Sequence, residues 1–342
     1  MNANFSAPFV YTGLTLNQKN IVIILSLSLQ LLVLLVYKDF VAFFSIFFAT
    51  AGAVAADILL TYLGENRFHF NFDSLTIGLI SGFFLPVSLG FVASFCISFF
   101  AFTLVCAVFG GRGSNWINPV MFAVCIAYLA YPEVFHAISL NLEKLQRNGT
   151  VFSVLQLSDL HVLKQDQEIT SALNSVFLHG IGVTLPEGYI SLLVRISSPI
   201  PAFRYNILTL LSSIILFSFR IIPKMQSVAF LGTYGILVWL FPWFPDLGSV
   251  ASGDMLCAFL TSGVLFTAFF VLPESGSSPR TKTGRCIYGM LTGVFAFLIA
   301  GPGFSAIGIP FAVLAGNIFT PLIESAEQKL YRRKRMKYDF EN

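Results

Sequence analysis

The feature that most constrains this chain is a succession of apolar runs that occupies almost its whole length. Runs such as 21–37 and 40–62 are long enough to cross the roughly 30 Å of hydrocarbon in a bilayer. Neither run alternates polar with apolar residues, as the strands of a membrane barrel do. Because a lipid-exposed backbone must satisfy its own hydrogen bonds, such runs form helices. The sequence therefore predicts an all-α polytopic membrane protein.

Composition excludes a soluble domain, and with it a nucleic-acid-binding module. Charged residues make up 11% of the chain and hydrophobic residues 56%, whereas soluble domains carry about 25% charged residues. The five cysteines and four histidines are scattered singly, with no CxxC pair and no ligand spacing. We therefore expect no metal site within this chain, because zinc and iron–sulfur ligands come in closely spaced groups.

The apolar runs fall into two sets of five transmembrane helices. The first set occupies residues 1–135, a long polar insert follows at 136–202, the second set occupies 203–324, and a basic tail occupies 325–342. Polar loops of such length tend to be functional, and we expect a short amphipathic or re-entrant segment around 188–196. The ten expected spans are 21–37, 40–62, 74–89, 91–109, 117–135, 203–222, 225–244, 252–272, 285–301 and 304–324.

Lysine and arginine residues set the expected orientation. With the N-terminus in the cytoplasm, most of the 20 Lys and Arg residues fall on the cytoplasmic side, as the positive-inside rule requires. Both termini are then cytoplasmic, and the long insert is extracytoplasmic. Five spans in each half give the halves opposite topology, as in transporters built from inverted repeats.

A glycine-rich loop, FGGRGSNWINP at residues 109–119, separates two expected spans. Its glycines give unusual backbone freedom, its asparagines supply hydrogen-bonding groups, and its proline suits the first turn of the next helix. Irregular backbone at this depth must be shielded by protein or line a cavity, so we expect it to bind a cofactor or an ion. The alternative is a simple turn between helices. The candidate ligands are Gly110, Gly111, Gly113, Asn115 and Asn118.

Asp57 is an ionisable residue well inside an expected span. At a rise of 1.5 Å per residue it lies about 8 Å from the cytoplasmic end of that span. A charge there is costly unless it is paired or hydrated, so a place on an ion path is the first interpretation. The alternative is a protonated Asp57 that bonds a neighbouring helix.

Several segments, in this order, resemble one family of membrane proteins. They are Asp73 at the start of DSLTIGLISG, the glycine-rich loop 109–119, FLGTYGILVWL at 230–240, ESGSSPRTKTGRCIYG at 274–289 and GIPFAVLAGNIFTPLIE at 308–324. This pattern is similar to the family that contains the RnfD subunit of the Rnf electron-transport complex and the NqrB subunit of the sodium-pumping NADH:quinone reductase. The length and the short N-terminus favour the Rnf type.

The resemblance implies a ten-helix subunit of an ion-translocating oxidoreductase in the bacterial inner membrane. Such a subunit carries a flavin mononucleotide (FMN) joined by its phosphate to an extracytoplasmic threonine, and a second, non-covalent flavin (riboflavin or another) within the helices. Electrons from ferredoxin, flavodoxin or NADH pass through it and neighbouring subunits, coupled to Na⁺ or H⁺ translocation. A cofactor-free channel or solute transporter is the alternative, because inverted five-helix halves suit that function too.

Thr170 is the expected attachment residue, because its distance to the following helix matches the family. It lies near the end of the polar insert, on the predicted outer face, where we expect the accessible, flexible segment that an attaching enzyme needs. This chain has QEIT at 167–170 where the family has Ser-Gly-Ala-Thr, and Cys106 where a lysine is common. Thr150 and Thr184 are rivals within the insert, and loss of the covalent flavin is a further alternative.

Overall fold

The computed structural model describes residues 14–65, 71–109, 115–135, 163–182, 184–240, 254–274, 276–301 and 305–341, and every regular element in these ranges is helical. Within these described ranges, five helices are long and apolar enough to cross a membrane, and three shorter apolar helices accompany them. The chain is therefore an all-helical polytopic membrane protein, as its sequence predicts. The five long candidates are Leu16–Val36, Phe40–Gly64, Phe91–Val108, Lys282–Ala300 and Gly308–Arg332.

The first group of helices is built around α2. A buried stripe of alanines on α2 lets its neighbours α3 and α4 approach closely, because small side chains permit tight helix contacts in membranes. Helix α1 packs on α3, and α4 packs on α5. The helices of this group are α1 (Leu16–Val36), α2 (Phe40–Glu65), α3 (Phe72–Phe84), α4 (Phe91–Val108) and α5 (Pro119–Ala130).

The second group is built around α14, which packs against α11 and α15. Helix α11 also contacts α12, and a π-helical turn at Thr267–Val271 continues α13. The helices of this group are α10 (Asn206–Ser218), α11 (Lys224–Leu240), α12 (Met255–Thr261), α13 (Val264–Phe266), α14 (Lys282–Ala300) and α15 (Gly308–Glu341).

Helix α3 is shorter than the expected span 74–89. It ends at Phe84 because Leu85 precedes Pro86 and takes an extended conformation, with ψ of 133°. A 3₁₀ turn at Val87–Leu89 follows.

The expected span 252–272 is also broken. Gly263 separates α12 from α13 with φ of 73°, and a Cβ there would lie 1.9 Å from the ring of Phe203, so only glycine fits. The two broken segments meet in the core: the ring of Phe266 lies 5.6 Å from Phe83 and 5.3 Å from Phe84, between ring centroids.

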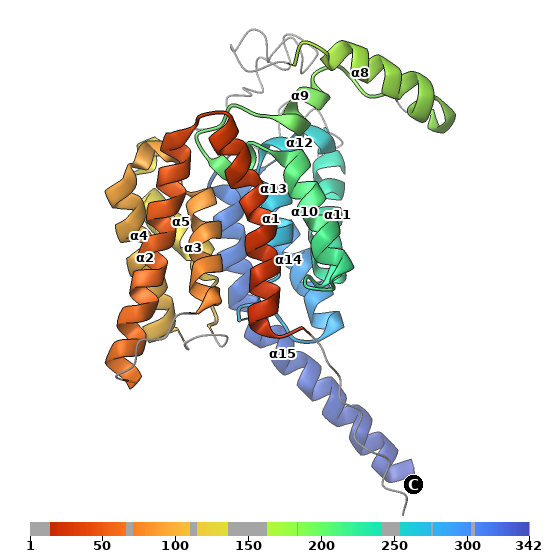
Figure 1. The fold of residues 1–342 in the computed structure, drawn as a ribbon. Coiled ribbons are helices and arrows are strands. Elements are labelled where there is room, and N and C mark those ends of the chain that lie inside the picture. The colour runs from red at the N-terminus through yellow and green to blue at the C-terminus, as the bar shows by residue number, and fades with distance from the viewer. Residues whose placement is uncertain are drawn as a thin grey trace, which may run out of the picture.

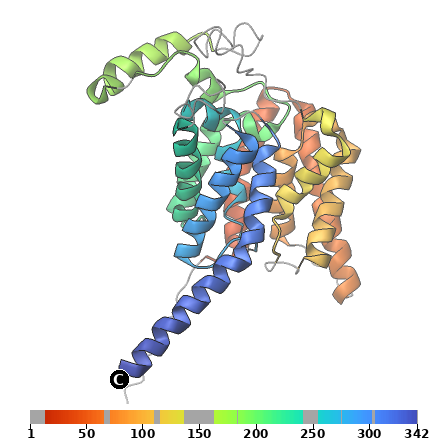
Figure 2. The same ribbon diagram turned by 180° about the vertical axis from the view of Figure 1, so that it is seen from behind.

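The bundle has two distinct ends (Figure 1). The start of α1 and the projecting C-terminal part of α15 lie at one end, here called the α15 end. Helices α8 (Asp166–Leu173) and α9 (Tyr189–Val194) lie at the opposite end, called the insert end. Helix α9 coincides with the short segment expected around 188–196. Both views show α15 continuing out of the bundle as one helix, so the expected boundary at 324 falls inside it (Figures 1 and 2).

Candidate functional site

Asn118 joins the two groups of helices at the α15 end. Its Oδ1 accepts hydrogen bonds from the backbone N–H groups of Val120 (3.0 Å) and Met121 (3.2 Å), so it caps α5 directly before Pro119. Its Nδ2 donates to the carbonyl of Val271 at 3.1 Å, the last residue of the π-helical turn. The buried Asn118 side chain therefore ties the end of the glycine-rich loop to the broken helix of the second group.

Asn115, from the same loop, contacts Glu274. Its Nδ2 donates to Glu274 Oε1 at 3.3 Å and to the carbonyl of Ile117 at 3.0 Å. Glu274 also accepts from the N–H groups of Gly276 (3.1 Å) and Ser277 (3.0 Å), and from Ser277 Oγ (2.5 Å). A Cβ on Gly276 would lie 2.0 Å from Asn115 Oδ1, so only glycine permits this approach.

Two further carboxylates lie near the start of α3. Asn20 Nδ2 donates to Asp73 Oδ1 at 3.4 Å, and Asp73 lies in the first turn of α3, where the helix dipole favours an anion. Asn71, which precedes α3, donates to Asp57 Oδ2 at 3.3 Å. Asp57 is 1% exposed. The structure thus gives Asp57 a side-chain partner from the segment before the neighbouring helix.

Burial raises the pKa of Glu274, and the nearby charge of Asp73 raises it further, while hydrogen bonds from Ser277, Asn115 and Gly276 oppose these effects. Two like charges therefore lie close together at this end of the bundle, one on α3 and one beyond the π-helical turn. Such a perturbed carboxylate beside a second one is typical of functional sites.

A cavity of about 240 Å³ lies between α1, α3, the start of α5 and the π-helical turn. Asn20, Asp73, Asn118 and Glu274 line it, with basic side chains such as Lys19 and Arg285. The lining therefore combines carboxylates, amides and cations in one small space, which suits a cation or the polar edge of a ring. Neither Asp57 nor Asn115 lines this cavity.

The glycines Gly110, Gly111 and Gly113 lie outside the described residues, as does Thr150. Of the expected site residues, Asn115 and Asn118 are brought together, and Asp57 lies on α2 at the same end. The sequence did not lead us to expect Glu274 or Asn20 as site residues, although Glu274 begins the segment 274–289 that resembles the family. The signal for Glu274 in the sequence is its place just after the expected span 252–272.

Among the residues that the structure describes, no group of three or more His, Cys, Asp or Glu could hold a metal ion.

At the insert end, Thr170 lies within α8 and is 2% exposed. Its Oγ1 donates to Asp166 Oδ1 at 3.3 Å. The Asp166 carboxylate, 0% exposed, also accepts from the N–H groups of Gly188 (2.8 Å) and Ser191 (2.7 Å), and from Ser191 Oγ (2.5 Å). Thr170 is therefore not on the accessible, flexible segment that we expected, whereas Thr184 is exposed.

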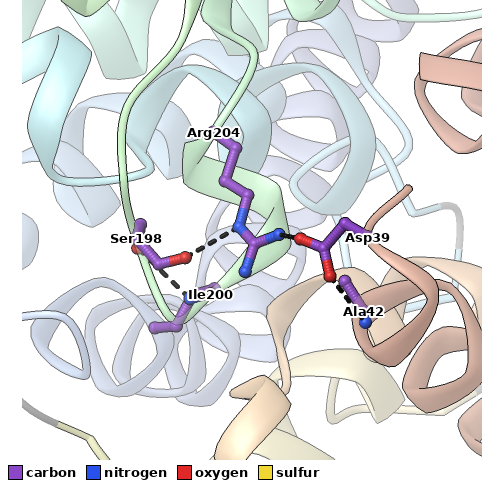
Figure 3. A network of polar contacts seen from close by, with 5 residues as sticks. All are labelled: Asp39, Ala42, Ser198, Ile200 and Arg204. Atoms are coloured by element: carbon purple, nitrogen blue, oxygen red, sulfur yellow. Dashed lines mark hydrogen bonds and ion pairs between the residues drawn. The ribbon is translucent and has the colours of Figure 1, made fainter. Parts of the chain in front are cut away.

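A second polar contact at the insert end joins the α1–α2 turn to the segment before α10 (Figure 3). Asp39 forms an ion pair with Arg204 and accepts from the N–H of Ala42 at 3.2 Å. Arg204 Nε donates to the carbonyl of Ser198 at 2.7 Å, and Ser198 Oγ accepts from the N–H of Ile200 at 3.2 Å. These contacts pair opposite charges and hold the two halves together at this end.

Comparison with known proteins places the chain in a family. The family described as NQR2, RnfD, RnfE matches residues 4–332. The D-type subunit of the ion-translocating oxidoreductase complex of Psychromonas ingrahamii is 26% identical over 349 residues, covering 96% of this chain and 98% of the relative. The D-type subunit of the corresponding complex of Actinobacillus succinogenes is 25% identical, and the match covers 93% of this chain and 94% of the relative. The D-type subunit of the Na⁺-translocating ferredoxin:NAD⁺ oxidoreductase complex of Acetobacterium woodii is 23% identical. This match covers 82% of this chain and 79% of the relative. The chain belongs to the NQR2, RnfD, RnfE family.

Proposed function

We propose that this chain is the RnfD subunit of an Rnf-type complex, in which electron transfer from ferredoxin, flavodoxin or NADH is coupled to Na⁺ or H⁺ translocation. The observation that carries this proposal is the family match over residues 4–332. Relatives named as the D-type subunit of an ion-translocating oxidoreductase complex also cover nearly the whole chain. Its partners are then the other membrane and peripheral subunits of that complex.

The proposed architecture is ten transmembrane helices in two inverted halves of five. Contacts between equivalent helices of the two halves support this architecture. The first helices of the two groups, α1 and α10, contact each other, and so do the fifth helices, α5 and α15. The third elements, α3 and α12–α13, are both broken and meet at Phe266. Such pairing of equivalent helices is expected around a pseudo-two-fold axis in the membrane plane, and broken helices in corresponding positions mark transporter binding sites.

The proposed location is the bacterial inner membrane, with the α15 end and both termini in the cytoplasm. The α15 end carries most of the basic residues that flank the described helices, such as Lys19 at the start of α1, Lys224 at the start of α11 and Lys282 at the start of α14. An excess of Lys and Arg near helix ends favours the cytoplasmic side.

The cavity at the α15 end is the proposed place for the non-covalent flavin, riboflavin or another. Amides fit the polar edge of a flavin ring, and Ile77, Ile80 and Phe269, which also line the cavity, fit its faces. When bound, a flavin supplies one-electron chemistry, and the protein supplies position and electrostatics. Asp57, on the same side, is proposed for the ion path. The glycine-rich loop is proposed to hold the flavin or an ion through Gly110, Gly111, Gly113, Asn115 and Asn118; of its two asparagines, Asn118 lines the cavity and Asn115 contacts Glu274 beside it.

A spectrum of the complex, purified through a tag on this chain, tests the proposal. We expect flavin absorbance that bleaches on chemical reduction, and electron-driven ion uptake by vesicles that is lost when this chain is deleted. Ile77→Trp fills the cavity and should remove the non-covalent flavin. Ile287→Trp, at a half-exposed position on α14, should keep the flavin and serves as the matched control. A complex without flavin, with ion uptake independent of this chain, contradicts the function. Flavin retained in Ile77→Trp contradicts the location.

A further inference from the structure

Asp166 and Thr170 form a closed hydrogen-bonded unit with α9. The two oxygens of an ionised carboxylate offer about four acceptor positions. On Asp166 these positions face Thr170 Oγ1, the N–H of Gly188, and the N–H and hydroxyl of Ser191. Ser191 Oγ in turn accepts from the N–H of Leu163 at 3.1 Å. The unit joins the start of α8 to the start of α9, and neither Asp166 nor Thr170 has an open side.

This geometry does not fit a flavin phosphate on Thr170. Attachment replaces the hydroxyl proton with phosphorus, so the oxygen can no longer donate to Asp166. The product is a phosphodiester that carries one negative charge, and this charge would lie beside a buried carboxylate. All four donors on Asp166 are neutral groups, so they would not offset a second anion. At 2% exposure, the side chain of Thr170 also leaves no passage for the rest of the flavin.

The local sequence explains how this unit forms. Asp166 and Thr170 are four residues apart on α8, so their side chains share one face of the helix. Gln167 and Glu168 are exposed, and Gln167 Nε2 donates to Glu187 Oε2 at 3.1 Å. The QEIT segment thus continues a regular helix, where a Ser-Gly-Ala-Thr segment has lower helix propensity.

We propose that Thr170 is a positioning residue in this chain and not a flavin attachment site: Asp166 retains its hydroxyl, and the pair holds α8 against α9. This inference is separate from the proposed function, because a non-covalent flavin at the α15 end does not depend on Thr170.

In-gel flavin fluorescence of the denatured full chain, co-expressed with a flavin transferase, tests the attachment. We expect the natural chain and Thr170→Val to give the same signal. A fluorescent band in the natural chain that Thr170→Val abolishes would overturn the proposal. A band that survives Thr170→Val and disappears in Thr184→Val supports it and places the flavin on the exposed threonine. The absence of any band also supports it.

Hydrogen exchange in the purified complex tests the positioning role. Thr170→Val keeps the shape of the side chain and removes the donor, so the amides of Gly188 and Ser191 should exchange severalfold faster. Thr170→Ser keeps the donor and should restore the natural rate. If Thr170→Val leaves these rates unchanged, Thr170 does not act through Asp166 and the proposal is wrong.

Discussion

The two ends of the bundle place their carboxylates in different surroundings. At the insert end, Asp39 meets a cation, Arg204, and Asp166 is enclosed by four neutral donors. At the α15 end, Asp73 and Glu274 lie close enough for one charge to raise the pKa of the other, and both line a cavity. These two carboxylates at the insert end are thus neutralised or saturated within the protein, whereas at the α15 end two carboxylates line a cavity together with basic side chains.

This difference separates structural from functional carboxylates. A carboxylate with all its acceptor positions occupied and no cavity beside it stabilises the fold, and its removal leaves buried donors unpaired. A pair of carboxylates at a cavity costs stability, because like charges repel and burial disfavours the charged form of a carboxyl group. Such an arrangement persists where the molecule uses it, for example to bind a cation. This difference supports a structural role for the carboxylates of the insert end and is consistent with the proposed binding of an ion or cofactor at the α15 end.

The largest effect on stability is expected from Asp166→Ala. The change leaves the buried N–H groups of Gly188 and Ser191 without an acceptor, which should lower the free energy of unfolding by about 3 kcal/mol. Thermal unfolding of the purified chain in detergent measures the loss. Asp166→Asn keeps one carbonyl acceptor and should lose about half as much. An unchanged melting temperature in Asp166→Ala would break the comparison, because the insert end would then not depend on its carboxylate.

Asp57→Asn should act on coupling with little effect on folding. The substitution keeps the shape and removes the charge, so electron transfer should persist while ion uptake per electron falls. Vesicles that contain the complex allow both rates to be measured together. Asp39→Asn makes the same chemical change at the insert end and serves as the matched control, with coupling retained. If ion uptake is unchanged in Asp57→Asn, Asp57 is only a structural hydrogen-bond partner and the functional assignment of the α15 end is weakened.

Much of the fold follows from local sequence. Apolar runs of membrane length predict the helices, and Asn118 before Pro119 is a local signal for the start of α5. The breaks in the third helix of each group are harder to predict from the sequence. Leu85 and Gly263 lie inside apolar runs, and a hydrophobicity pattern does not register that Pro86 turns the chain or that the Phe203 ring excludes a side chain at Gly263.

The site was predicted in part, because its contacts join distant segments. The glycine-rich loop identified Asn115 and Asn118, but the partner of Asn115 is Glu274, 159 residues away. The polar composition of the insert predicts that Thr170 lies on an accessible segment. Its burial arises from Asp166, four residues away, and from the contact of Asp166 with Ser191, 25 residues along the chain. Polar composition predicts exposure on average and does not show which polar side chains satisfy one another.

Glu274→Gln should have the smallest effect on stability. The way in which that effect depends on pH is the sharpest test of the α15 end. Burial, with the charge of Asp73, raises the pKa of Glu274 above its ordinary value of 4.5. A carboxyl group with a raised pKa in the folded state binds more protons than in the unfolded state. Its contribution to stability is therefore full below pH 4.5 and is lost as pH rises through the folded-state pKa.

Melting temperatures of the natural chain and Glu274→Gln, measured in detergent from pH 4 upward, should therefore diverge. The natural chain should lose stability relative to the variant as pH rises, since only the natural chain must then hold a charge at position 274. A constant offset is also expected at every pH, because glutamine has only one carbonyl oxygen. Placed where Oε2 lies, that oxygen keeps both bonds from Ser277, but the NH₂ group then faces the donors Gly276 N–H and Asn115 Nδ2. The slope of the difference, rather than its size, is thus the measurement. Parallel curves would mean that Glu274 is held no differently from a solvated carboxylate, and like-charge crowding at the cavity would no longer distinguish the two ends.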